Sequence, residues 1–177
     1  MASAGTPTPA SSSALPPGAA GLLSALANEA RATELFGEIT LGGTAVRCAA
    51  ANSAAPAEYS LSFDGATAWV SLTTPDRYLS QSIEQDLVHT GDKLGDLLLD
   101  ELIDLAPPGD GLTKVPERAP MVEHFRSPDK LFTFRVHVPL PANPASSEAL
   151  AVARLYLLAM EACFRPLGDM DAGDDED

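Results

Sequence analysis

The spacing of apolar residues changes along the chain, and each change marks the start of another predicted element. Leucine and alanine recur at helical spacing over residues 19–36, which predicts an amphipathic helix. The segment 38–51 alternates apolar and polar residues around Gly42 and Gly43. This alternation predicts one strand, or two short strands that bend at the two glycines.

An Asp64-Gly65 pair predicts a β-hairpin, because this dipeptide favours a type I′ turn with two central residues. The turn sets the pairs of residues that face one another: Phe63 with Ala66, Leu61 with Ala68, and Tyr59 with Val70. The predicted pairs share one apolar face. The opposite face carries serine and threonine, and Trp69 stands among them as the one large side chain.

Leucine and isoleucine then recur at helical spacing over residues 76–105, which predicts one long helix or two helices that meet near Gly91. A glycine inside a helix lowers stability by about 1 kcal/mol relative to alanine, so the presence of Gly91 and Gly95 needs an explanation. Two explanations stay open. The glycines admit the close approach of another backbone, or the chain simply breaks at Thr90-Gly91.

The last third of the chain predicts two more strands, over 121–126 and 130–140, and a final helix that ends near Leu167. Asn143 or Ser146 is the expected N-cap of this helix. Its polar stripe is narrow and the rest of its circumference is apolar. Such a helix is either deeply buried or shared with another subunit.

These elements predict an α+β fold in the order α-β-β-β-α-β-β-α. Short hairpin links favour an antiparallel sheet, and the alternation along its strands places the helices on one face. Residues 19–168 form the single predicted domain. Residues 1–18 are rich in Ala, Ser, Thr and Pro and predict a disordered leader, whereas the acidic run 169–177 predicts a disordered tail.

Charge and cysteine content exclude several classes of function. The chain has 177 residues and a net charge of −14, so phosphate backbones and anionic membranes are poor partners. No run of eighteen apolar residues predicts a membrane span. Two cysteines far apart, Cys48 and Cys163, favour a reducing compartment, and we expect a cytoplasmic protein.

Motifs of catalysis are missing from the sequence, which lacks GxGxxG, a P-loop, GxSxG and CxxC. His89 lies three residues from both Asp86 and Asp92, an incomplete metal-ligand set. Cys163 lies in the apolar final helix, where a cysteine is usually a small core residue. We therefore expect no enzyme activity, no metal and no cofactor. Trp69 is either covered by another element or offered to a partner, since tryptophan is enriched in binding hot spots.

Over residues 20–167 the chain resembles the class I type III secretion chaperones of the CesT/Tir-chaperone family. The likeness rests on the element order, on the strand 131–140 that ends in Pro-Leu, and on the helix that follows from Ser147. The hairpin over 59–72 is similar to the family's central hairpin. Residues 97–101 depart from a Leu-Leu-x-Ala-Asn-like run of that family, and the leader and tail are additions. The bacterial YbjN-like domains look similar in the same features.

The resemblance implies a cytoplasmic bacterial homodimer that binds an extended segment of a secreted effector and keeps it competent for secretion. It also implies contact with the secretion-apparatus ATPase. The alternative is a YbjN-like regulatory or sensory domain that binds another protein. The candidate effector-binding residues are Leu22, Leu23, Leu26 and Trp69. The candidate dimer-interface residues are Leu94, Leu98, Met121 and Phe125.

Overall fold

Six strands form one antiparallel sheet in the computed structural model of the protein, which describes residues 14–109 and 115–172. The order of the strands across the sheet is β1-β2-β3-β4-β6-β5. The strands are β1 (Phe36–Gly42), β2 (Ala45–Ala50), β3 (Glu58–Asp64), β4 (Thr67–Thr74), β5 (Glu123–Arg126) and β6 (Phe132–Val138). The helices are α1 (Ala19–Thr33), α2 (Arg77–Thr90), α3 (Leu94–Leu105), α4 (Ser147–Phe164) and the short 3-10 helix η1 (Gly168–Met170). The predicted α+β class is confirmed.

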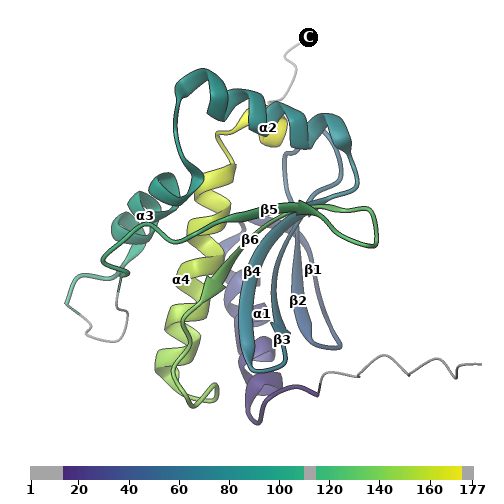
Figure 1. Cartoon of the computed structure of the whole chain (residues 1–177). Helices are drawn as coiled ribbons and strands as arrows, with labels where there is room; N and C mark the ends of the chain where they lie inside the picture. The colour runs from purple at the N-terminus through teal and green to yellow at the C-terminus, as the bar shows by residue number, and fades with distance from the viewer. Residues whose placement is uncertain (1–13, 110–114, 173–177) are drawn as a thin grey trace, which may run out of the picture.

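The element order is close to the predicted one, and the structure decides two alternatives that the sequence leaves open. The segment 38–51 forms the paired strands β1 and β2, so four strands rather than three precede the central helices. The central segment forms two helices rather than one long helix. Helices α1 and α4 cover the same face of the sheet, whereas α3 packs on α4 and α2 lies across the end of the sheet (Figure 1). The expectation that helices cover one face therefore holds for α1 and α4.

The register of the β3–β4 hairpin differs from the prediction by two residues. The turn consists of Gly65 and Ala66, and Asp64 pairs with Thr67. Gly65 has a φ of 60°, and a glycine at the first central position is the preference of a type II′ turn. Because side chains alternate with a period of two, a shift of two residues leaves every side chain on its predicted face.

Each of the two explanations for the central glycines applies to one of them. Gly91 ends α2 with a φ of 80°, and its N–H donates to the carbonyl oxygen of Leu87 at 2.9 Å. Gly95 lies beneath another backbone, since a Cβ there would be 2.5 Å from the carbonyl oxygen of Pro120. The chain thus breaks at Gly91 and packs closely at Gly95.

Helix α4 owes its apolar circumference to burial within the chain. The sheet, α1 and α3 surround it, and eleven of its residues are buried. Ser146 is its N-cap, and the Ser146 Oγ accepts a hydrogen bond from the N–H of Ala149 at 3.1 Å. A second subunit is not needed to cover this helix.

Parts of the predicted leader and tail pack against the fold. Leu15 contacts the core, and Met170 is only 3% exposed. The N–H of Ala172 donates to the carbonyl oxygen of Asn52 at 3.0 Å. The remainder of the leader and of the tail, 1–13 and 173–177, lies outside the described residues. Within the described part of the chain, no helix has the length and apolar content needed to cross a membrane.

Candidate functional site

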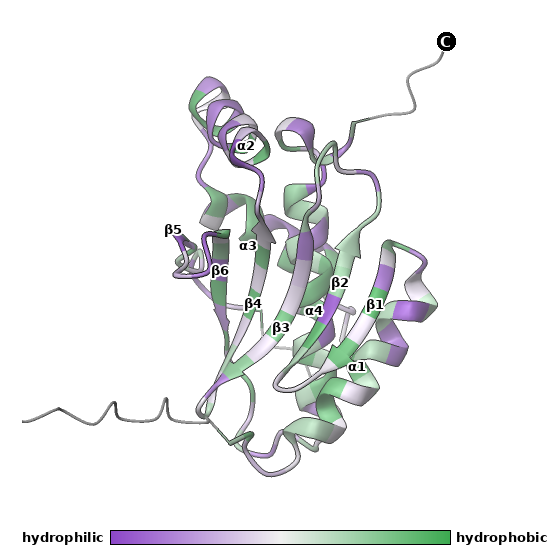
Figure 2. Cartoon of the chain, turned by 90° about the vertical axis from the view of Figure 1, so that its right-hand side faces the viewer, coloured by the Kyte–Doolittle hydropathy of each residue, from purple (hydrophilic) through white to green (hydrophobic). Residues whose placement is uncertain are grey.

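The face of the sheet away from α1 and α4, here called the uncovered face, carries none of the described helices (Figure 2). Its two central strands carry four short hydroxyl side chains, here called the hydroxyl floor: Ser60 and Ser62 on β3, Ser71 and Thr73 on β4. Glu58 lies opposite Thr73 and Trp69 lies opposite Ser62. Ser60 and Ser71 pair directly, with their Oγ atoms 3.0 Å apart.

An arginine lies between two aromatic rings at one border of the floor. Arg135 on β6 pairs with Ser71 on one side and with Glu123 on the other. Its guanidinium carbon is 4.1 Å from the ring centroid of Trp69 and 4.9 Å from that of Phe125. Its Nε donates to Oε2 of Glu123 at 2.6 Å. These four residues, Trp69, Glu123, Phe125 and Arg135, are called the arginine sandwich below.

The arginine sandwich shows how far Trp69 is covered by other elements of the chain. Trp69 is half-buried, because Arg135 covers one side of its ring and the edge of His137 lies against it with centroids 5.9 Å apart. A cation over an aromatic ring contributes about 0.5–2 kcal/mol, depending on its exposure. Two rings and a carboxylate together hold the Arg135 side chain in one place.

The opposite border of the floor carries a second ion pair. Arg47 Nε on β2 is 3.3 Å from Oε1 of Glu58 on β3, and both side chains are partly exposed. Burial raises the pKa of the Glu58 carboxyl, and the nearby Arg47 partly opposes this shift. The arginine and the glutamate at each border offset one another, although the whole chain has a net charge of −14. Each border of the floor therefore carries one positive and one negative side chain.

A pocket of about 610 Å³ opens at the α2 end of the same face. Its walls are mainly alanine and proline, so short side chains create the space. The lining residues are Ala49, Ala50, Ser53, Ala54, Ala55, Pro56, Ala57, Glu58, Thr73, Pro75 and Leu131. Ala49, Glu58 and Thr73 pair across β2, β3 and β4, which makes the alanine pocket continuous with the hydroxyl floor.

The structure places the three predicted effector-binding leucines of α1 in the core. Leu22, Leu23 and Leu26 are 3%, 1% and 0% exposed. Their apolar stripe is accounted for by packing beneath the sheet, so they offer no surface to a partner. Trp69 is the one predicted effector-binding residue that lies at the surface.

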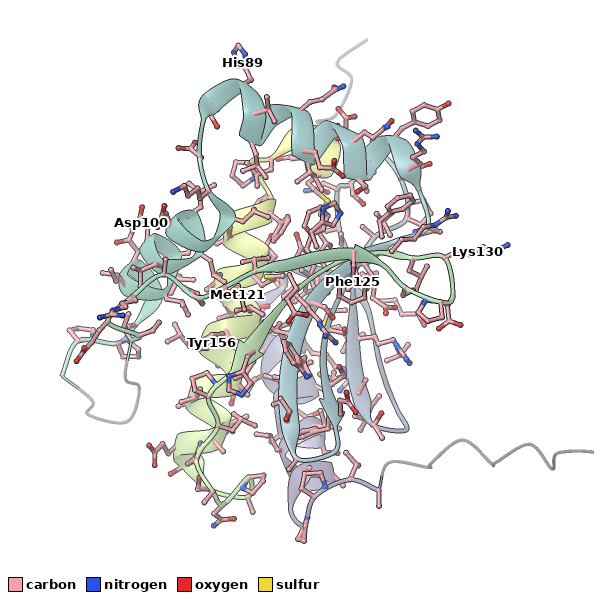
Figure 3. All side chains as sticks on the ribbon, in the orientation of Figure 1. His89, Asp100, Met121, Phe125, Lys130 and Tyr156 are labelled. Atoms are coloured by element: carbon pink, nitrogen blue, oxygen red, sulfur yellow. The ribbon has the colours of Figure 1, made fainter. Side chains whose placement is uncertain are left out.

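The predicted dimer-interface residues lie in different environments. Leu98 is fully buried against the core and Leu94 is half-buried, so neither presents a free apolar surface. Met121 is 79% exposed, and Phe125 belongs to the arginine sandwich. Figure 3 shows Met121 and Phe125 along the same segment, in front of α4 and of the sheet. Of the four residues, Met121 alone is largely available to a second copy.

The residues that hinted at catalysis do not form a site. His89 is exposed at the end of α2, and Asp86 accepts a hydrogen bond from the N–H of Gly168 at 3.1 Å. No group of three metal-ligating side chains exists among residues 14–109 and 115–172. Burial raises the pKa of Cys48 and of Cys163 to about 12, so both thiols are protonated at neutral pH. These two features no longer favour an enzyme.

Sequence reasoning missed Arg135, Glu123 and the alanine pocket as parts of one site. Arg135 is visible in the alternating strand as a residue of the polar face. Its partners are not visible, because the register of the edge strand β5 brings Glu123 and Phe125 beside it. The residues Ser127-Pro128-Asp129 favour a turn between β5 and β6, but they do not by themselves show which residues of the two strands face one another.

Comparisons of the chain with protein-family models, with curated proteins and with solved structures found no match.

Proposed function

We propose that the protein is a chaperone-type binding protein that holds an extended segment of a client protein against the uncovered face. The resemblance to the class I type III secretion chaperones makes a secreted effector the proposed client. The observation that carries the proposal is the hydroxyl floor, which lies between two ion-paired borders and leads into an apolar pocket.

The chemistry of the floor suits a polypeptide backbone. Serine and threonine hydroxyls both donate and accept hydrogen bonds, so they can pair with the amides of an extended segment. Ser62 and Thr73 are partly exposed and offer accessible hydroxyls, whereas Ser60 and Ser71 are nearly buried and bond one another. The alanine pocket then receives one apolar side chain of the segment, since pockets for alternate side chains give specificity to extended peptides.

The edges of the sheet offer a second mode of attachment. Strands β1 and β5 are the two outermost strands, and each has a neighbour on one side only. An extended segment can add to such an edge through main-chain hydrogen bonds. Leu41 on β1 is 47% exposed and supplies apolar contact beside that edge.

Assembly and location belong to the same proposal. A cytoplasmic homodimer that contacts a secretion-apparatus ATPase is what the resemblance implies, and each of these features stays a prediction. Sedimentation of the purified chain measures the oligomeric state directly. A YbjN-like regulatory domain would use the same face for a partner that is not secreted, so the identity of the captured client separates the two functions.

Site-specific photo-crosslinking tests the proposal. A photo-reactive residue replaces Ser62 on the hydroxyl floor in one variant and Glu148 in the first turn of α4 in the control variant. We expect the client to crosslink through position 62 and much less through position 148, with one short segment of the client modified. Equal crosslinking at both positions, or modification scattered over a folded client, would contradict the proposal.

A further inference from the structure

Arg135 combines a fixed side chain with unused hydrogen-bond donors. An arginine has five N–H donors, and the contact with Glu123 uses the one on Nε. In the part of the chain that the structure describes, Nη1 and Nη2 make no hydrogen bond. The Arg135 side chain is 31% exposed, so part of it is open to a ligand above the floor.

We infer that the arginine sandwich is a preformed receptor for a carboxylate of the bound segment, and this inference rests on the proposed function. The planar end of a guanidinium matches the two oxygens of a carboxylate and binds them through two parallel hydrogen bonds. Trp69 and Phe125 hold the guanidinium plane, so little side-chain freedom is lost on binding.

The same geometry disfavours other ligands of the sandwich. A cation does not fit between the rings of Trp69 and Phe125, because the guanidinium of Arg135 already occupies that space. A phosphate dianion would bring two negative charges close to the Glu123 carboxylate, which lies 2.6 Å from Nε. A carboxylate brings a single charge and leaves the contact between Glu123 and Nε in place.

The alanine pocket adds a second requirement to the same segment. Thr73 lines the pocket and pairs with Thr133, and Arg135 follows two residues later on the same face of β6. Residues two apart in a strand are about 7 Å apart, which is also the rise of two residues of an extended ligand. An acidic residue and an apolar residue at a fixed short spacing therefore form the motif that this face would select.

Selection from a library of random octapeptides, displayed with both ends fused, tests the inference on the full chain. The wild type, Arg135→Lys and the control Arg154→Lys are each used as bait; Arg154 lies on α4, away from the uncovered face, and forms an ion pair with Glu29 at 3.3 Å. We expect the wild type and Arg154→Lys to enrich peptides with Asp or Glu at a fixed spacing from a large apolar residue. Arg135→Lys should keep the apolar preference and lose the acidic one, because lysine has neither the planar fork nor the ring contacts.

The best peptide is then resynthesised in three forms. The first keeps its acidic side chain; the second has Glu→Gln or Asp→Asn and an amidated C-terminus. The third has the same substitution and a free C-terminal carboxylate. Trp69 is the only tryptophan, so its fluorescence reports binding at the sandwich. We expect the acidic form to bind about tenfold or more tightly than the amidated variant, as hydrogen bonds between charged groups predict. The third form distinguishes a side-chain carboxylate from a terminal one.

The outcomes separate the two claims. Peptides enriched without any acidic preference, or equal affinity of the acidic and amide forms, overturn the carboxylate receptor and leave the binding of an extended segment standing. A failure to enrich any peptide on the wild type overturns both. Loss of the acidic preference in Arg154→Lys as well as in Arg135→Lys shows that the preference does not depend on the sandwich and overturns the assignment to it.

Discussion

His124 stacks on Phe134 with ring centroids 3.9 Å apart and planes 8° apart. The two residues face one another across β5 and β6, and Phe134 in turn contacts Phe164 of α4. The Nε2 atom of His124 lies 3.4 Å from Oγ of Ser80 and 3.6 Å from Oε1 of Glu84, both on α2. One imidazole therefore joins the edge strand, the core and α2.

The first prediction concerns pH. Burial lowers the pKa of His124 below its ordinary value of 6.5, although the charge of Glu84 acts in the opposite direction. The unfolded chain then binds more protons than the fold between these two pKa values, so the free energy of unfolding falls as pH decreases through and below about 6.5. Urea denaturation at a series of pH values measures this loss.

The pH prediction has a matched control. His124→Gln should remove that part of the pH dependence, whereas His137→Gln, at an exposed position of β6, should retain it. Identical pH profiles for the wild type and His124→Gln would show that another group is responsible. Burial also raises the pKa of the Glu58 and Glu161 carboxyls from 4.5, and this contribution to the pH dependence is common to all three proteins.

A second prediction uses two glycines as a pair. Gly95→Ala places a Cβ 2.5 Å from the carbonyl oxygen of Pro120, and we expect it to lower the free energy of unfolding by about 1–3 kcal/mol. In α1, a Cβ added at Gly21 would have nothing within 4 Å, so Gly21→Ala should raise the free energy of unfolding by up to about 1 kcal/mol. Thermal or urea unfolding of both variants checks the opposite signs, and a stabilised Gly95→Ala would contradict the close packing.

A third prediction concerns the thiols. Because burial raises the pKa of Cys48 and Cys163 from 9.0 to about 12, the thiolate fraction at pH 8 is about a thousandfold smaller than for an ordinary cysteine. We expect a disulfide reagent such as DTNB to label both slowly in the native protein and rapidly in denaturant. A fast native phase for one equivalent of thiol would show that one cysteine is accessible.

A fourth prediction separates core from client contacts. Leu26 is fully buried, so Leu26→Ala should cost about 2–5 kcal/mol of stability, whereas Leu41→Ala at a 47% exposed position should cost far less. Any loss of client binding in Leu26→Ala should then follow the unfolded fraction measured by circular dichroism. Loss of client binding in a fully folded Leu26→Ala variant would show that Leu26 contributes to client binding directly.

Local signals in the sequence predict the fold well where they repeat over several residues. The faces of the hairpin are correct despite the wrong register, because Leu61 and Val70 keep their face when the pairing shifts by two residues. The break at Gly91 follows from the positive φ that ends α2. The number of strands before α2 is harder to predict, because Gly42 and Gly43 are compatible with a bend in one strand and with a turn between two strands.

The candidate site is less predictable because it depends on pairing between distant segments. Trp69 stands out in the sequence as a large side chain among hydroxyls, and this signal leads to the correct face. Its contact with Arg135 needs the β4–β6 pairing, and the contact of Arg135 with Phe125 needs the β5–β6 pairing. The β4–β6 pairing has no sequence signal of its own, and the turn over 127–129 predicts that β5 and β6 pair without giving their register. The leucines of α1 mislead for a related reason, since a core stripe and a binding stripe have the same periodicity.

Strand β5 has only four residues, and its alternate side chains serve opposite sides of the sheet. Glu123 and Phe125 hold Arg135 on one side, while His124 touches α2 and the core on the other. Loss of the His124 contacts on protonation would therefore fall on the same short strand that positions Arg135. Under the proposed function, we expect the affinity for the client to decrease as pH falls through and below about 6.5, and an affinity that does not change with pH would show that the two faces of β5 act independently.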